Sequence, residues 1–180
     1  MRKLMRSIVA VLAAVTLSAG VFATPAAATG GVQFGVVSYE LAFYHAGKCL
    51  DVLNLSKDLG APVGLWECNG GSNQTWIPER ISSDDREFRL RAQHSDMCLD
   101  LVGNSTANGA TFGQWECNTG RNQAFRYWDS GVGGWFFQVQ HSGKCLDVIG
   151  FATANGSPVG QWDCDPTGTA ANQRILFTRR

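Results

Sequence analysis

Long basic runs, apolar segments beyond the N-terminus and helical periodicity are all missing from this chain. Its 180 residues carry 15 Lys and Arg against 15 Asp and Glu, which gives no formal net charge. No Lys- or Arg-rich run after residue 28 could attract phosphates, so no nucleic-acid partner is expected. No segment after residue 28 is apolar enough to cross a bilayer, so no membrane insertion is expected either.

Several motifs of enzymes and metalloproteins are absent as well. The chain contains no Gly-x-Ser-x-Gly nucleophile motif. It also lacks the Gly-rich loop ending in Gly-Lys-Ser/Thr that cradles a phosphate. No Cys-x-x-Cys pair occurs, and the three histidines lack the spacing of metal ligands. The sequence therefore predicts neither a metal nor another cofactor.

Residues 1–28 have the composition of a secretory signal peptide. A basic start is followed by a mostly apolar segment at 8–22 and by small residues at 26–28, which offer a cleavage site. Cleavage after Ala23 and an uncleaved anchor are the alternatives. We therefore expect a secreted, extracellular protein in which residues 29–180 form the folded domain.

In place of the missing features, the chain has one unit of 47 to 49 residues written three times. Each copy contains a Cys-Leu-Asp tripeptide, then a Trp-acid-Cys tripeptide, then an Asn-Gln pair. The copies span about residues 35–83, 84–131 and 132–180. A function carried by similar sites, one per repeat, fits this pattern better than a function that needs one unique site.

The six cysteines belong to the repeats, two in each, always 19 positions apart. Six cysteines allow 15 connectivities, and an exported chain meets oxidising conditions in which disulfides form. Repeat symmetry selects the pairing within each repeat. The predicted bridges are Cys49–Cys68, Cys98–Cys117 and Cys145–Cys164.

Apolar residues alternate along the segment before each histidine, which is typical of a half-buried strand. The alternating positions are Tyr39, Leu41 and Phe43; Phe88, Leu90 and Ala92; and Trp135, Phe137 and Val139. The Cys-Leu-Asp segment predicts a second strand and residues 63–68 a third. A fourth is expected to begin at the Asn-Gln pair. Four strands in each repeat make about twelve, so the sequence predicts an all-β domain.

The repeated motifs, with a constant 17 residues from Cys to Trp, resemble those of the ricin-type β-trefoil lectins, a family of sugar-binding modules. The resemblance covers about residues 35–180. It implies a β-trefoil of pseudo-threefold symmetry, with a six-stranded barrel capped by three hairpins. The family's closing Gln-x-Trp motif is intact at 74–76 and altered at 123–125 and 173–175. In that family its aromatic residue packs in the core.

Sugar recognition needs an aromatic surface for the C–H face and polar groups for the hydroxyls. Each repeat supplies such a set. The candidate sugar-binding residues are Asp51, Trp66, Asn73 and Gln74; Asp100, Trp115, Asn122 and Gln123; and Asp147, Trp162, Asn172 and Gln173. The resemblance implies that Asp and Asn bind hydroxyls, that Trp stacks on the sugar and that Gln supports the site from behind.

Structural roles are the alternative for every one of these residues, since threefold packing would also recur. One departure from the family pattern weakens any transfer of a particular sugar. Many members have Gln two positions before the Trp, where this chain has Gly64, Gly113 and Gly160. Its own Gln114 and Gln161 come one residue later, which on a strand points them to the opposite face.

Three classes of function remain in competition. A secreted, non-catalytic lectin with up to three shallow sites is favoured, with a poly- or oligosaccharide partner for which galactose- and xylose-type sugars are the candidates. An enzyme is disfavoured because His45, His94 and His141 occupy equivalent, separated positions, and a glycoside hydrolase because the repeated carboxylates are dispersed in the same way. A β-trefoil that binds protein, such as a protease inhibitor or a toxin subunit, is the third class. A separately encoded protein partner is compatible with the lectin.

Overall fold

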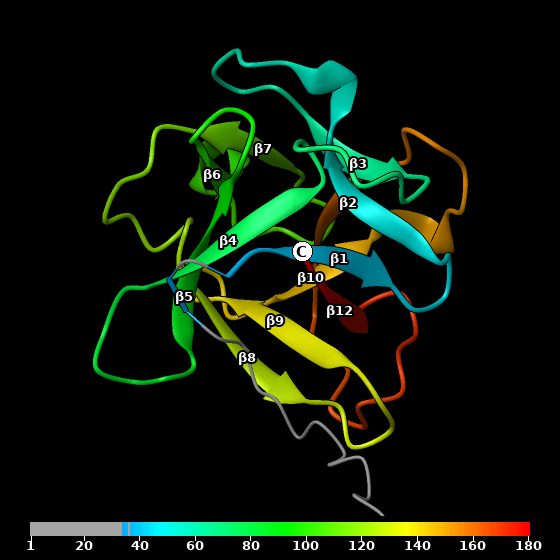
Figure 1. Ribbon diagram of the computed structural model, residues 1–180. Helices are drawn as coiled ribbons and strands as arrows, with labels where there is room; N and C mark the ends of the chain where they lie inside the picture. Colours follow the sequence, from blue (N-terminus) through cyan, green and yellow to red (C-terminus); the bar gives the residue numbers. More distant parts are fainter. Residues whose placement is uncertain (1–33, 36) are drawn as a thin grey trace, which may run out of the picture. The chain divides into compact units, whose positions relative to one another are not determined.

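The computed structural model describes residues 34, 35 and 37–180, so the expected signal peptide lies outside the described residues. Within them the chain forms twelve strands and three short 3-10 turns (Figure 1). No helix in the described part is long and apolar enough to cross a membrane. The predicted all-β architecture with four strands in each repeat is confirmed.

The four strands of each repeat follow in the same order. The first repeat contains β1 (Tyr39–Phe43), β2 (Lys48–Val52), β3 (Val63–Trp66) and β4 (Thr75–Arg80). The second contains β5 (Glu87–Ala92), β6 (Cys98–Leu101), β7 (Phe112–Trp115) and β8 (Phe125–Asp129). The third contains β9 (Trp135–Val139), β10 (Cys145–Val148), β11 (Val159–Trp162) and β12 (Ile175–Arg179).

Six of these strands close into a barrel, and the other six form three hairpins (Figure 1). The ring runs from β1 through β4, β5, β8, β9 and β12 back to β1, and every neighbouring pair is antiparallel. Closure leaves the barrel without an open edge. The hairpins are β2–β3, β6–β7 and β10–β11. This is the β-trefoil that the sequence predicted.

The barrel core is filled by the alternating apolar residues of the first strands and by the residues that close each repeat. Trp76, Phe125 and Ile175 occupy equivalent positions and are all fully buried. The indole of Trp76 also donates a 2.9 Å hydrogen bond to the Leu50 carbonyl oxygen. The change from Trp to Phe to Ile therefore alters the packing and keeps the topology, as expected for apolar residues of differing shape.

Each hairpin is closed by one disulfide, and the three bridges are those that repeat symmetry predicted. Every cysteine of the described residues is in a bridge. In the first repeat, Cys49 of the Cys-Leu-Asp motif lies opposite Trp66 in the neighbouring strand. Its disulfide partner is Cys68, two positions after that Trp. A covalent link therefore holds the Trp-acid-Cys segment against its partner strand.

Two of the predicted strand boundaries are wrong. The third strand ends at Trp66 and does not continue to residue 68. The fourth begins at Thr75, one residue after the Asn-Gln pair. The pair lies in a turn, in which the Gln74 amide nitrogen donates to the Gly71 carbonyl oxygen. The same side chains are committed to polar contacts with the hairpin, described below, and this keeps them out of the strand.

The hairpins meet one another through backbone, and this contact requires glycine two positions before each Trp. A Cβ atom at Gly160 would lie 2.5 Å from the Ala110 carbonyl oxygen of the preceding repeat. At Gly64 the corresponding distance is 2.7 Å, to the Ser157 carbonyl oxygen, and at Gly113 it is 3.1 Å. Any side chain there would push two hairpins apart, which explains the departure from the family's Gln.

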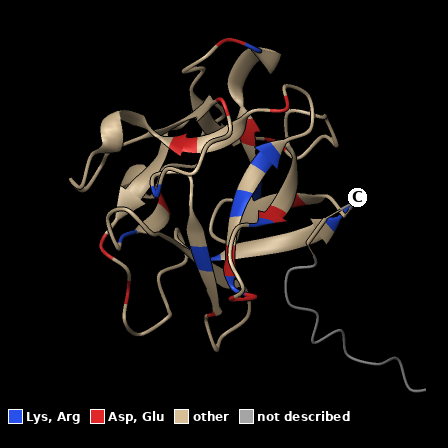
Figure 2. Ribbon diagram, turned by 90° about the vertical axis from the view of Figure 1, so that its left-hand side faces the viewer, with Lys and Arg blue, Asp and Glu red and all other residues tan. Residues whose placement is uncertain are grey.

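Basic and acidic residues both lie on the barrel strands (Figure 2). Glu79 lies between Arg89 and Arg91, at 2.8 and 2.6 Å. Arg126 contacts both Asp84 and Glu87. Opposite charges therefore lie next to one another on these strands.

Replacing Gly160 by Ala should lower the free energy of unfolding by about 1–3 kcal/mol, because the new methyl group meets backbone that can only shift as a whole. Gly113→Ala should have a smaller effect, since its Cβ would have more space. Urea unfolding measures both, with Thr106→Ala in an exposed loop as the control. Equal stability of all three variants would contradict this account of the hairpin contact.

Candidate functional site

Three cavities lie at equivalent positions on the three hairpins, with volumes of about 360, 440 and 420 Å³ in repeats one to three. Each is lined by the Asp of Cys-Leu-Asp, the Trp of Trp-acid-Cys and the Asn of the Asn-Gln pair. These residues are Asp51, Trp66 and Asn73; Asp100, Trp115 and Asn122; and Asp147, Trp162 and Asn172. The structure thus brings the predicted residues together within each repeat and keeps the repeats apart.

One carboxylate oxygen organises each cavity. In the first repeat, Oδ2 of Asp51 accepts hydrogen bonds from Asn73 Nδ2 at 2.9 Å and from Gln74 Nε2 at 2.8 Å. The second and third repeats have the same two bonds at 2.8–2.9 Å. Two amide donors on a charged acceptor make a strong contact. It ties the hairpin strand to the loop that precedes the next barrel strand.

The other oxygen of the same carboxylate remains available. Oδ1 of Asp51 has no hydrogen-bond partner among the described residues, and it is not one of their buried unsatisfied atoms. The same holds for Asp100 and Asp147. Each Asp therefore uses Oδ2 for the fold and leaves Oδ1 open to accept a hydrogen bond in the cavity.

The Asn side chain likewise uses one polar atom for the fold and leaves the other open, whereas Gln74 uses both. Asn73 uses its Nδ2 hydrogens on Asp51 and on the Val52 carbonyl oxygen, which leaves its Oδ1 as a second open acceptor. Gln74 is fully buried, and all of its polar atoms have partners in the protein. Its Nε2 also donates to the Glu67 carbonyl oxygen, and its Oε1 accepts from the Asn69 amide. The geometry thus makes Asn a cavity residue in all three repeats and Gln74 a support behind the first cavity, whereas Gln173 also lines the third.

The three candidate Trp side chains are exposed, unlike Trp76 in the core. Their exposed fractions are 39% for Trp66, 44% for Trp115 and 45% for Trp162. Each is the last residue of its strand and pairs with the half-cystine of the partner strand. The side chain therefore points outward, and the indole surface is available to an apolar face of a ligand.

Burial raises the pKa of all three site aspartates above its usual range. Hydrogen bonds from the Gln and Asn amides oppose this effect and only partly offset it. The pKa of Asp147 is raised the most, to about 6. With a pKa of about 6, the Asp147 carboxyl group is mostly ionised at neutral pH and can act as an acceptor.

Sequence reasoning missed that the second cavity is bounded by a loop from the preceding repeat. In the second cavity, Gly60 lies where an added Cβ would be 3.5 Å from the ring of Trp115. Gln114 holds this loop by donating to the Ser56 and Asp58 carbonyl oxygens. The spacing of Gln114 already predicted that it faces away from the cavity, and only the fold shows what it contacts.

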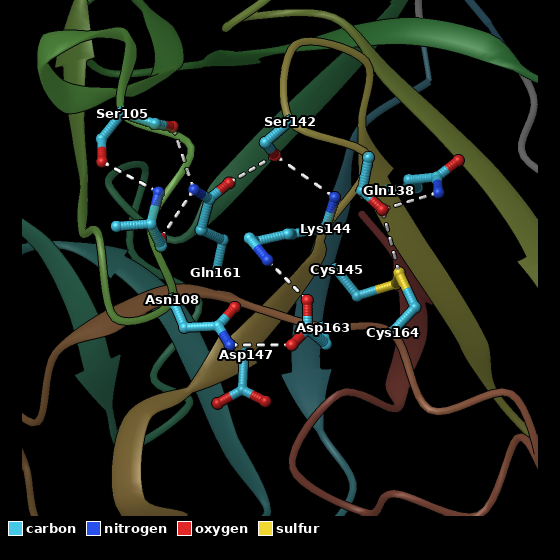
Figure 3. A network of polar contacts seen from close by, with 12 residues as sticks. Ser105, Asn108, Gln138, Ser142, Lys144, Cys145, Asp147, Gln161, Asp163 and Cys164 are labelled. Carbon is cyan, nitrogen blue, oxygen red and sulfur yellow. Dashed lines mark hydrogen bonds and ion pairs between the residues drawn. A yellow bond between two sulfur atoms is a disulfide. The ribbon is translucent and has the colours of Figure 1, made fainter.

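Figure 3 shows the same arrangement in the third repeat. Gln161 donates to the carbonyl oxygens of Ser105 and Ala107 in the preceding loop, and Asn108 of that loop reaches Asp163 at 2.8 Å. Lys144 contacts the same carboxylate at 2.5 Å. In the first repeat Leu65 stands in the place of this Gln. The loop is held there by backbone hydrogen bonds of Leu65 and by the side chain of Asn155, whose Oδ1 accepts from Lys48 Nζ and the Glu67 amide.

The three histidines lie between repeats and outside the cavities. His45, His94 and His141 each donate from Nε2 to a backbone carbonyl oxygen of another repeat, at 3.0, 2.8 and 2.6 Å. A carbonyl can only accept, so Nε2 carries the proton. Among the described residues no cluster of His, Cys, Asp or Glu could hold a metal ion.

The family model described as the ricin-type beta-trefoil lectin domain matches residues 37–174. No curated protein matches the chain. The designed threefold symmetric protein ThreeFoil is 36% identical with a TM-score of 0.72, and the match covers 78% of this chain and 96% of ThreeFoil.

Two natural proteins extend this comparison. An exo-β-1,3-galactanase from Clostridium thermocellum is 29% identical with a TM-score of 0.72, over 79% of this chain and only 30% of the enzyme. The ricin B-like lectin of Macrolepiota procera, solved with lactose, is 19% identical with a TM-score of 0.69, over 84% of this chain and all of the lectin. At that identity the second likeness concerns the fold alone.

Titration of the Asp147 carboxyl, followed by its side-chain ¹³C resonance, should show a midpoint at about pH 6. Asn172→Ala should move the midpoint higher, because it removes a donor that favours the ionised form. Since folding raises this pKa, the group stabilises the fold most at acid pH, and its contribution declines as pH rises from about 4 towards 6. A midpoint near 4 would contradict the assignment.

Proposed function

Because the chain belongs to the family of ricin-type β-trefoil lectin domains, we propose that it is a secreted, non-catalytic lectin with one shallow sugar site in each repeat. The observation that carries the proposal is the threefold recurrence of one cavity. Each copy combines an exposed indole, an open oxygen on a carboxylate that is buried in two copies and partly buried in the second, and an open amide oxygen.

These groups match the two kinds of surface that a sugar offers. The indole of Trp66 takes the face that carries C–H groups. Oδ1 of Asp51 and Oδ1 of Asn73 are both acceptors, so they select a ligand that donates two hydrogen bonds from neighbouring positions. A pair of sugar hydroxyl groups does this. Gln74 positions the carboxylate and does not touch the ligand.

Each site alone should bind weakly, because one stacking ring and two hydroxyl contacts bury little surface. A free monosaccharide is expected to bind at about the millimolar level, near −4 kcal/mol. A polysaccharide or oligosaccharide that spans several sites gains avidity of about 10²–10⁴. Polymers, with galactose- and xylose-type chains as the first candidates, are therefore the proposed targets.

The proposal also includes secretion of the protein and a purely binding, non-catalytic role. Three disulfides fit an oxidising, extracellular location. The first and second cavities each contain one carboxylate. In the third, Asp163 is bound by Lys144 and Asn108 and Asp165 by Thr167, so neither is arranged as a hydrolytic partner of Asp147. Since the match covers only 30% of the galactanase, a catalytic partner encoded elsewhere is compatible with a binding role for this chain.

Asp100→Ala should remove one site without unfolding the domain, although it leaves the amides of Asn122 and Gln123 without their shared acceptor and lowers the stability. Monosaccharide stoichiometry should drop by one, whereas polymer retention on an affinity column should fall steeply, since avidity depends on the number of sites. The triple variant of Asp51, Asp100 and Asp147 to Ala should lose binding to both. Asp85→Ala, whose side chain is exposed and lies outside the three cavities, is the control.

Near-UV circular dichroism should confirm that the triple variant is folded. If the folded variant retains its glycan as tightly as the parent protein, the assigned sites are wrong. A glycan-array screen of the parent protein identifies the sugar to use.

Incubation of the protein with xylan, arabinan, galactan and β-glucan should release no reducing sugar. The first two cavities have one carboxyl group each, and the additional carboxylates of the third, Asp163 and Asp165, are bound by neighbouring side chains. The measurement is a reducing-end assay over many hours, with a known hydrolase as positive control. Sustained release by a pure preparation, abolished by heat, would place the protein among the enzymes instead.

A further inference from the structure

A strained backbone conformation recurs beside all three cavities. The short 3-10 turn after each Cys-Leu-Asp strand ends in a residue with positive φ: 54° at Leu55, 50° at Asn104 and 55° at Phe151. This left-handed conformation costs most L-residues roughly 1–2 kcal/mol, and Asn is one of the few that adopt it readily. Asn104 thus suits its position, whereas Leu55 and Phe151 are strained.

Burial does not compensate this strain. Leu55 and Phe151 are each 60% exposed, and no large hydrophobic residue in the described part is more exposed. Both line the cavity of their own repeat together with its Trp, as Asn104 does in the second repeat. A strained, exposed apolar side chain at the edge of a cavity is best explained by contact with a ligand.

The Phe151 ring is also held in place before any ligand arrives. His45 of the first repeat contacts it edge-on, with ring centroids 5.9 Å apart. The same imidazole donates from Nε2 to the carbonyl oxygen of Ala152, the next residue in the chain. A ring fixed in this way loses little conformational freedom on binding.

The third cavity therefore presents two exposed rings, and this limits the ligands that it can prefer. A sugar has one apolar face, which Trp162 can take. A second ring against the remaining surface would desolvate hydroxyl groups without replacing their hydrogen bonds. A substituent that ends in a methyl group would instead bury apolar surface against Phe151. The second cavity has the amide of Asn104 at the same place and gains nothing from a methyl group.

We propose that the third-repeat cavity prefers sugars that carry a methyl-ended substituent, and that Phe151 sets this preference. The substituent is the acetamido group of an N-acetylated amino sugar or the methyl group of a 6-deoxy sugar. The second cavity, with Asn104, lacks the preference, so the three sites are not equivalent. The inference rests on the proposed sugar-binding function and adds the class of sugar at one site.

Indole N–H resonances of Trp115 and Trp162 report the second and third sites separately in NMR titrations. Suitable probes are free galactose, N-acetylgalactosamine and 6-deoxygalactose, of which only the last two carry a methyl group, and the same three forms of glucose. In the parent protein, at least one methyl-bearing probe should bind the third site about fourfold more tightly than the plain sugar, the gain expected from burying about one methyl group. The second site should not discriminate.

Two reciprocal variants make the test specific. Phe151→Asn should abolish the preference at the third site without destabilising the fold, because Asn accepts the left-handed backbone. Asn104→Phe should create the preference at the second site. Val132→Asn, a change at an exposed apolar residue outside the cavities, should alter neither site.

The possible results separate this inference from the proposed function. If the third site binds the plain and methyl-bearing sugars equally, or if Phe151→Asn leaves its preference unchanged, the inference is overturned and the lectin function stands. If no probe and no glycan of an array shifts any site, both are overturned. Comparing the N-acetylated probe with the 6-deoxy probe shows which of the two substituents the third site prefers.

Discussion

Both the hairpin and the cavity of each repeat depend on the hydrogen bonds of one carboxylate, that of the Asp in the Cys-Leu-Asp motif. Its Oδ2 atom accepts from Asn and Gln, and the same Gln holds the backbone at the end of the Trp strand, so that Asp51, Gln74 and Glu67 form one chain of contacts. A buried charge is unfavourable unless it is paired or hydrogen-bonded, and here two amide donors supply the compensation. The remaining desolvation appears as a raised pKa. The carboxylate can serve a ligand because only one of its oxygens is used by the fold.

The repeats are not independent units, although each contains a complete set of site residues. The loop of one hairpin packs against the next through glycine backbone, and histidines reach carbonyl oxygens of other repeats. Gln114 and Gln161 strengthen this contact in two repeats, whereas Leu65 replaces them in the first. Disturbing one hairpin is therefore expected to affect the cavity of its neighbour.

Within this common frame the three cavities have diverged in the residues around the shared Asp, Trp and Asn. The second has Arg121 in its lining, with a guanidinium that contacts the Gln140 carbonyl oxygen. The third has the carboxylates of Asp163 and Asp165, the latter with its pKa lowered by hydrogen bonds from Thr167. Three cavities that share a geometry and differ in their surroundings would let one lectin domain bind different units of a heterogeneous polymer.

The sequence by itself determined the repeats, the disulfide pairing, the strand order and the grouping of residues into three sites. These follow from spacing, because a fixed interval between Cys, Trp and Asn-Gln leaves few ways to superpose the copies. Whether Trp66 is core or exposed, and whether Asn73 or Gln74 reaches the cavity, could not be read from spacing. That depends on which face of a strand or turn meets the rest of the molecule.

Only the tertiary structure decided the contacts between repeats and the strain beside the cavities. Gly64 is required by a carbonyl oxygen of Ser157, 93 positions along the chain, and no local pattern contains that information. The left-handed backbone of Phe151 is likewise imposed by the turn that joins two paired strands, against the preference of the residue itself. Local sequence sets which elements form, whereas the close approach of distant backbone sets which atoms are left facing solvent.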